Sequence, residues 1–180
     1  KLISETLNAF GSIDILVNNA GTLVERRSIE AMDEQLWDKV MDVNLKSAFL
    51  CCNAVIPTMK AKGWGRIINV TSIAARNGGG FGAGHYSTAK AGVLTLTKSL
   101  AIELAGTGIL VNSVAPGVIT TPYHEEYSTS EARKMFADNT PLKREGLPEE
   151  VAYPILFLAS EQASLNIGET IEINGGLLMD

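Results

Sequence analysis

Four short strand-like segments alternate with helical segments along this chain, and this alternation is the feature that most constrains its fold. The segments cover residues 13–17, 66–70, 109–115 and 169–174. Near-continuous apolar strands are typical of a parallel sheet that is buried on both faces. The sequence therefore predicts an α/β protein with a doubly wound parallel sheet, in a single domain over residues 1–180.

Helix signals flank the strand segments. Gly11 stops an amphipathic segment at the start of the chain, Asp33 is a plausible N-cap, and Pro148 suits the first turn of a helix. Pro57 and Pro154 fall inside helical patterns, where a proline bends a helix. The expected helices cover residues 1–10, 34–62, 86–105 and about 148–160.

The segment 118–147 contains little apolar periodicity, apart from a short helix over 129–138. A long excursion of this kind is often a lid or binding loop, so we expect it to close over a substrate. Its mixture of aromatic and acidic residues identifies no substrate, and sugars, acyl-carrier thioesters, steroids and small ketones all remain open. The candidate lining residues are Tyr123, His124, Tyr127, Met135 and Phe136.

The charge balance argues against two kinds of partner. The 180 residues include 15 Lys and Arg against 20 Asp and Glu, which gives a net charge of −5. An acidic chain without a basic cluster is a poor surface for a nucleic acid or an anionic membrane. No apolar run approaches the roughly 18 residues of a membrane span, and residues 1–10 do not resemble a signal peptide.

Cys51 and Cys52 are adjacent within a helical pattern. Neighbouring side chains on a helix point in different directions, so we expect no disulfide between them and interpret both as packing residues. The two histidines, His85 and His124, supply no metal-ligand spacing, so we expect no metal site. A reducing, cytoplasmic compartment is the default expectation.

A tyrosine and a lysine are the first candidates for chemistry. Tyr86 and Lys90 lie four residues apart, and therefore on one face of the predicted helix. An ammonium beside a phenol lowers the pKa of the tyrosine, which suits it to proton transfer near neutral pH. Ser72, across a glycine-rich loop, is placed to supply a hydroxyl to the same space, with Thr71 as its neighbouring competitor. Asn44 interrupts an apolar helix face, and a buried amide there needs a partner.

Each of these residues, taken alone, also suits an ordinary structural role. Tyr86 fits a buried tyrosine with a satisfied hydroxyl, Lys90 a solvated helix lysine, and Ser72 a turn former at the end of a strand. Asn44 fits an asparagine bonded to a nearby backbone carbonyl. The combination of Tyr86, Lys90 and Ser72 is what favours catalysis.

With these residues in place, the whole chain resembles the short-chain dehydrogenase/reductase family. Any one of the matching motifs is weak, but five in the right order and at the right end of their elements make a specific pattern. The matches are Asn18-Asn-Ala-Gly21, Asn44, Ser72, the Tyr86-x-x-x-Lys90 pair and Pro116-Gly-Val-Ile-Thr-Thr121.

The resemblance implies a Rossmann-like fold and hydride transfer between a nicotinamide ring and a carbonyl or alcohol carbon. It implies that Tyr86 is the general acid or base and that Lys90 assists it and bonds the nicotinamide ribose. Ser72 would bond the substrate oxygen, and Asn44 would hold a water linked to Lys90.

The cofactor implied by the resemblance is NAD or NADP, and this chain does not show which. Asn19, Ala20 and Gly21 would pass close to the adenosine ribose, while the segment from Pro116 would meet the nicotinamide. The expected cofactor-binding residues are Asn19, Ala20, Gly21, Tyr86, Lys90, Pro116, Gly117, Ile119 and Thr121.

One departure from the family is large. Members begin with a strand, a glycine-rich turn and a helix that bind the pyrophosphate, and nothing in this chain matches them. We expect that roughly seventy to ninety residues are absent, at about 30 residues for each strand–helix unit. The segment 13–17 would then be an uncovered apolar sheet edge, which predicts poor stability, dimerisation or aggregation.

Three functional interpretations follow. The first is an oxidoreductase acting on a small carbonyl or alcohol, in the family's usual homo-oligomer, a dimer or homotetramer. The second is a non-catalytic truncated remnant that retains the fold's oligomerisation surfaces on the helices at 34–62 and 86–105. The third is a related isomerase or dehydratase that uses the same tyrosine–lysine pair.

Overall fold

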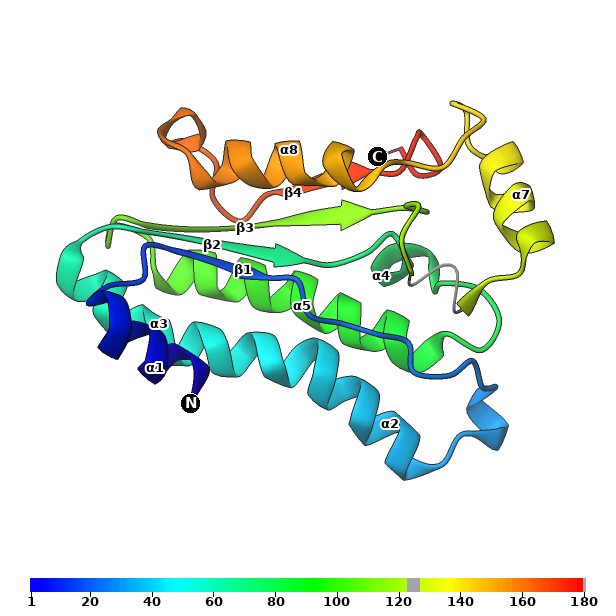
Figure 1. The fold of residues 1–180 in the computed structure, drawn as a ribbon, viewed down its shortest axis with the longest axis horizontal. Coiled ribbons are helices and arrows are strands. Elements are labelled where there is room, and N and C mark those ends of the chain that lie inside the picture. The colour runs from blue at the N-terminus through cyan, green and yellow to red at the C-terminus, as the bar shows by residue number, and fades with distance from the viewer. Residues whose placement is uncertain (123–126, 180) are drawn as a thin grey trace.

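The computed structural model, which describes residues 1–122 and 127–179, is built on one four-stranded sheet. The strands run parallel in the spatial order β1-β2-β3-β4, with Ile15 opposite Arg66 and Ser113 opposite Thr170 in the register (Figure 1). The strands are β1 (Ile15–Asn18), β2 (Gly65–Val70), β3 (Ile109–Pro116) and β4 (Thr170–Ile173).

Helices cover both faces of this sheet. The helices α3 and α5 lie on one face and α8 lies on the other, so the sheet is doubly wound as the sequence predicts (Figure 1). The α-helices are α1 (Leu2–Phe10), α2 (Glu34–Met41), α3 (Ser47–Lys62), α4 (Ala74–Asn77), α5 (Gly84–Glu103), α7 (Ser130–Asn139) and α8 (Pro148–Ala159). Three short turns are η1 (Ile29–Ala31), η2 (Asp42–Lys46) and η3 (Glu161–Ala163).

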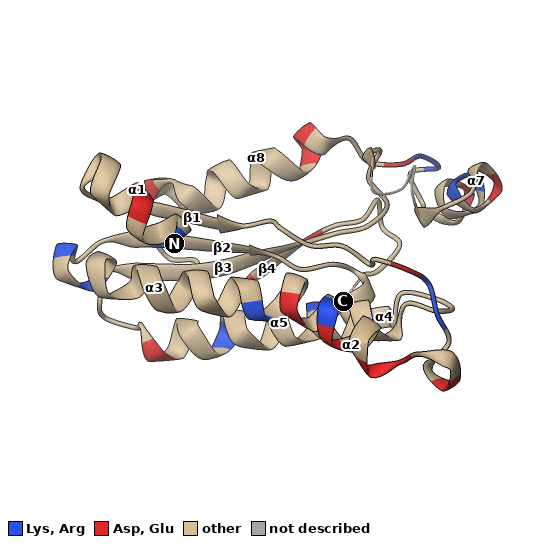
Figure 2. Ribbon diagram, turned by 60° about the horizontal axis from the view of Figure 1, so that its bottom comes forward, with Lys and Arg blue, Asp and Glu red and all other residues tan. Residues whose placement is uncertain are grey.

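Alternate residues of β2 supply the two cores. Ile67 packs with Val55 and Leu100 beneath α3 and α5, whereas Ile68 packs with Leu158 beneath α8. All six residues of β2 are buried, which explains why its sequence is continuously apolar apart from Arg66 and Asn69. Charged residues lie mainly on helices and loops, and the central strands are mostly free of them (Figure 2).

The helix ends predicted at Asp33 and Gly11 are confirmed, but one irregularity within a helix was not predicted. Asp33 Oδ1 accepts a hydrogen bond from the amide of Leu36 at 2.8 Å, and Gly11 ends α1 with a φ of 78°. The helix expected over 34–62 has the right span, but a single π-helical turn, η2, divides it into α2 and α3. No helix among residues 1–122 and 127–179 has the length and apolar character to cross a membrane.

Candidate active site

A cleft of about 980 Å³ opens where the parallel strands end. The loops after β1, β2 and β3 meet at this edge, which is where ligands bind in open α/β sheets. Ser72, from the loop after β2, lines the cleft together with Tyr86 and Lys90 of α5. The fold thus brings Ser72 to the same cleft as the Tyr86–Lys90 pair.

Lys90 is a buried cation next to Tyr86. Only 3% of Lys90 is exposed, and its Nζ lies 5.7 Å from the centroid of the Tyr86 ring. The ammonium donates to the carbonyl of Val70 at 2.8 Å. Burial disfavours the charged form and lowers the pKa of Lys90 from 10.5 to about 8. The side chain therefore keeps its proton in most molecules at pH 7.

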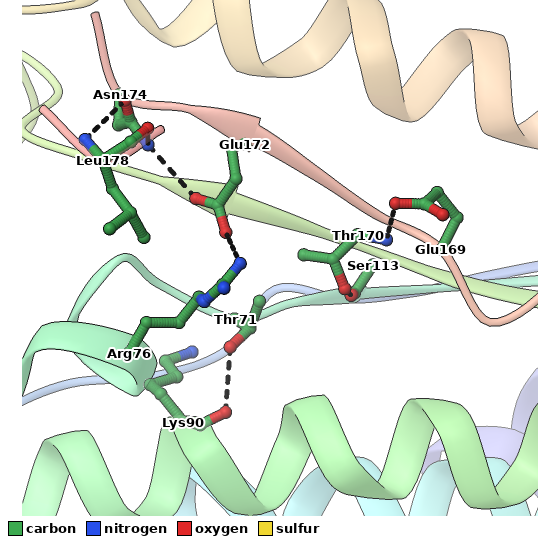
Figure 3. Close-up of polar contacts among 9 residues, drawn as sticks. All are labelled: Thr71, Arg76, Lys90, Ser113, Glu169, Thr170, Glu172, Asn174 and Leu178. Atoms are coloured by element: carbon green, nitrogen blue, oxygen red, sulfur yellow. Dashed lines mark hydrogen bonds and ion pairs between the residues drawn. The ribbon is translucent and has the colours of Figure 1, made fainter. Parts of the chain in front are cut away.

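A hydrogen bond from the end of β2 holds α5, the helix that carries Tyr86 and Lys90. Thr71 Oγ1 donates to the carbonyl oxygen of Lys90 at 2.8 Å (Figure 3). The hydroxyl proton of Thr71 is therefore used in a hydrogen bond to the backbone of α5. Ser72 Oγ instead accepts from the amide of Ala74 at 3.1 Å, an arrangement in which its own O–H can donate to a ligand. This difference favours Ser72 over Thr71 as the substrate-binding hydroxyl.

The short helix after Ser72 is anchored to the far strand of the sheet. Arg76 of α4 forms an ion pair with Glu172 of β4, with 3.4 Å between Nη1 and Oε1 (Figure 3). Glu172 also accepts from Asn174 Nδ2 at 3.2 Å. These contacts fix one wall of the cleft.

Asn44 sits behind the cleft, in the π-helical turn η2. Its Nδ2 donates to the carbonyls of Thr22 at 2.7 Å and Val40 at 2.8 Å. Its Oδ1 is buried and has no hydrogen-bond partner among the residues that the structure describes. A Cβ built on Gly21 would lie 2.6 Å from this Oδ1 and 2.9 Å from Lys90 Nζ. The two polar atoms therefore border one small space, which the lack of a side chain at Gly21 keeps open.

Most of the residues expected to hold the cofactor lie in the same cleft as Ser72 and Tyr86. Eight of the nine line the cleft, and the exception is Ala20. Gly117 is required there, because a Cβ would lie 2.8 Å from the Cα of Asn174. The turn beyond it is held by mutual backbone bonds: Gly146 N donates to Val118 O and Thr120 N to Gly146 O, both at 2.9 Å.

Of the five candidates in the segment expected to be a lid, one lines the cleft and another is bonded to the loop after β1. Phe136 of α7 lines the cleft, and the hydroxyl of Tyr127 accepts a hydrogen bond from Thr22 Oγ1 at 3.1 Å. Met135 is exposed and does not line the cleft. Tyr123 and His124 lie outside the described residues.

His85 and the cysteines have structural roles. His85 is fully buried, and its Nε2 lies 3.0 Å from the carbonyl oxygen of Glu25. Burial lowers the pKa of His85. Burial also raises the pKa of the Cys52 thiol to about 11, so it is a poor nucleophile, and no disulfide joins Cys51 to Cys52.

Sequence reasoning missed the loop between Gly21 and η1. Arg26 lines the cleft, and Val24 adopts a φ of 65°, which is a rare conformation for a β-branched residue. The amide of Glu25 donates to the carbonyl of Leu23 at 2.8 Å, which closes a tight three-residue turn around Val24. No motif or periodicity covers these positions, so the sequence alone held no signal for them.

This parallel sheet and its flanking helices define a Rossmann-like α/β protein, and comparison with known proteins gives the family. A family model described as Enoyl-(Acyl carrier protein) reductase matches residues 1–178. The chain is similar to the 3-oxoacyl-[acyl-carrier-protein] reductase FabG of Staphylococcus epidermidis, with 42% identity over 99% of this chain and 72% of that protein. The Thermotoga maritima protein of the same name shows the same identity and coverage. Nodulation protein G of Azospirillum brasilense is 44% identical over 93% of this chain and 67% of its own length.

The chain belongs to the short-chain dehydrogenase/reductase family. Membership of this family implies an oxidoreductase that uses NAD or NADP. The cleft residues described above fit that cofactor at its nicotinamide end.

Proposed function

We propose that this protein interconverts a carbonyl and a secondary alcohol, with Tyr86 as the acid–base residue. The observation that carries the proposal is the shared cleft, in which Ser72, Tyr86 and the buried Lys90 meet beside the expected cofactor residues. Bound nicotinamide supplies the hydride for reduction or accepts it in oxidation.

In the direction of reduction, Tyr86 donates its phenolic proton to the substrate's carbonyl oxygen. Ser72 donates a hydrogen bond to the same oxygen and stabilises the negative charge that develops on it. In oxidation the roles reverse, and Tyr86 takes the proton of the alcohol. The ammonium of Lys90 favours the phenolate form of Tyr86 and is placed to bond the nicotinamide ribose.

A proton must then return to Tyr86 from solvent. The unpartnered Oδ1 of Asn44 and the ammonium of Lys90 border the space beside Gly21. A water in that space would accept from Lys90 and donate to Asn44, because both groups have unused capacity of the right kind. Asn44 is therefore proposed as a positioning residue of a proton relay.

The names of the relatives suggest a first substrate. The Staphylococcus epidermidis and Thermotoga maritima proteins are named as reductases of 3-oxoacyl groups on acyl carrier protein. A 3-oxoacyl thioester is thus the first compound to assay, with the related isomerase or dehydratase chemistry as the alternative reaction. We also propose a cytoplasmic location and assembly as a homodimer or homotetramer.

A second candidate is a non-catalytic protein that retains the association surfaces of the fold. Phe49 and Leu50 on α3 and Ile102 on α5 are large apolar side chains exposed on the helices. Such side chains favour contact with another subunit. The intact set of Ser72, Tyr86 and Lys90 favours the enzyme instead.

The deciding experiment compares Tyr86→Phe with Tyr153→Phe, a matched removal of a hydroxyl from an exposed tyrosine of α8. We expect Tyr86→Phe to reduce turnover by about 10²- to 10⁴-fold, because a positioned acid–base group contributes that much. Nucleotide binding, followed by fluorescence titration with NADH and NADPH, should stay nearly unchanged, and Tyr153→Phe should match the wild type in both assays.

Two results would contradict the proposal. Retained turnover in Tyr86→Phe would remove the proton-transfer role from this residue. Absence of any NADH or NADPH binding by the wild-type chain would favour the non-catalytic candidate.

A further inference from the structure

The charge of the cleft differs from the charge of the protein. The chain has a net charge of −5, yet no carboxylate is found among the described residues that line the cleft. Arg26 and Lys90 are the charged side chains among those lining residues, and both are cations. A cleft with this lining favours an anionic ligand.

The two cations are placed differently. Lys90 is buried, bonded to the Val70 carbonyl and adjacent to the ring of Tyr86, so it serves the reacting end of the cleft. Arg26 is exposed at the mouth of the cleft, on the loop that follows β1. Arg26 thus offers a positive charge away from the acid–base pair.

Backbone carbonyls hold the guanidinium of Arg26 from two sides. Its Nε donates to the carbonyl oxygen of Tyr127 at 3.3 Å, and its Nη1 donates to that of Phe81 at 3.0 Å. Tyr127 belongs to the lid segment and Phe81 to the glycine-rich loop after Ser72, so Arg26 lies at the substrate end of the cleft. Of the expected cofactor residues, Asn19, Ala20 and Gly21 precede Arg26 on the loop after β1, and the others come from α5, from the end of β3 and from the loop after it.

These two bonds leave most of the guanidinium available. A guanidinium has five N–H donors, and Nε and one N–H of Nη1 are used. Arg26 forms no ion pair within the described part of the chain, whereas its neighbour Arg27 is paired with Glu25. A cation fixed by neutral carbonyls, with donors to spare, is preorganised for an incoming anion.

We propose that Arg26 binds an anionic group of the substrate, a carboxylate or a phosphate, at the mouth of the cleft. The proposal rests on the function proposed above, and it narrows the substrate to carbonyl or alcohol compounds that carry such a group. The planar guanidinium pairs with two oxygens of the anion, which orients the reacting carbon toward Tyr86 and Ser72.

The test removes the charge of Arg26 and varies the charge of the substrate. Arg26→Gln keeps a side chain that can donate to the backbone carbonyls but loses the cation, and Arg27→Gln is the matched control at an ion-paired neighbour. The substrate pairs are acetoacetate with ethyl acetoacetate, and dihydroxyacetone phosphate with dihydroxyacetone. These pairs separate a carboxylate from a phosphate, and each anion from its neutral analogue.

We expect Arg26→Gln to lower kcat/KM for the preferred anion by about ten- to a hundredfold, as the loss of a charged hydrogen bond implies. Most of the loss should appear in KM. The neutral analogue and the Arg27→Gln variant should change less than about twofold, which is the scale of surface substitutions.

Calorimetric titration of acetoacetate and of dihydroxyacetone phosphate separates this proposal from the catalytic one. Anion binding that weakens in Arg26→Gln would support the subsite even if no ketone were turned over. Equal losses for anionic and neutral substrates would overturn the proposal and leave Arg26 as a structural strap between the lid and the glycine-rich loop. A loss confined to the KM of NADH or NADPH would also overturn it.

Discussion

At the scale of single residues, Lys90 shows how the site is made at a cost to the fold. An ammonium with 3% exposure has lost most of its hydration, and one carbonyl hydrogen bond replaces only part of it. The physical consequence is the lowered pKa of Lys90, about 8 in place of 10.5. A neutral side chain would lose less hydration at this position, and the buried cation agrees with the role proposed for Lys90 beside Tyr86.

The lowered pKa of Lys90 predicts a particular pH dependence of stability. Between pH 8 and 10.5 the unfolded chain holds a proton at Lys90 that the folded chain releases, so the free energy of unfolding rises with pH across this window. The rise is about 3 kcal/mol for a shift of this size. The free energies of unfolding of the wild type and of Lys90→Met can be measured by urea unfolding from pH 7 to 10.5. The difference between the two should therefore change with pH.

Lys98→Met is the control for this experiment, because Lys98 lies on the same helix but is exposed. Its difference from the wild type should be flat with pH. If the difference in free energy of unfolding between the wild type and Lys90→Met were also independent of pH, burial would not lower the pKa of Lys90 as described.

At the scale of elements, one carboxylate joins α7 to the turn that follows β3. Arg133 of α7 forms a two-pronged ion pair with Glu145, at 2.8 Å from Nε and 2.6 Å from Nη2. Thr120 Oγ1 donates to the same carboxylate at 3.0 Å. Since Thr120 is next to Thr121 of the cleft, Glu145 couples the position of α7 to a wall of the site.

Glu145→Gln should loosen α7 without unfolding the sheet. The ion pair is largely shielded from solvent, so losing its charge should cost about 1–3 kcal/mol of local stability. Amide hydrogen exchange in α7 should then accelerate by about tenfold or more, while exchange in β2 and β3 stays unchanged. Asp138→Asn removes the exposed partner of Lys134 in the same helix and should have little effect. Unchanged exchange in α7 of the Glu145→Gln variant would contradict the coupling.

At the scale of the whole molecule, the β1 edge of the sheet is exposed and apolar. β1 is an edge strand in the described sheet, and its Ile15 and Val17 are 46% and 40% exposed. An apolar edge strand with unpaired backbone groups promotes association between chains. This agrees with the expectation drawn from the sequence that the segment 13–17 is uncovered.

The 180-residue chain is accordingly expected to self-associate through β1. Ile15→Lys should shift sedimentation-velocity profiles toward the monomer, because a lysine on an edge strand opposes pairing. Ile102→Lys places the same charge on α5, at a side chain that is 80% exposed. If Ile102→Lys dissociated the assembly and Ile15→Lys did not, the helices would form the interface in place of the edge.

Local patterns in the sequence predict the order of the main strands and helices and the candidate residues of the site. Apolar runs such as Arg66–Val70, caps such as Asp33, and the spacing of Tyr86 and Lys90 are local signals, because backbone geometry converts them directly into strands, helix ends and a shared face. These signals were enough for the α/β class and for the family.

The surroundings of those residues depend on the packing of distant segments in the folded chain. Loops that meet at one edge of the sheet bury Lys90 and create the space between Asn44 and Gly21. They also bring two distant backbone carbonyls within hydrogen-bond distance of Arg26. The physical reason is that desolvation and hydrogen bonding between distant segments are set by packing, and no periodicity within either segment records them.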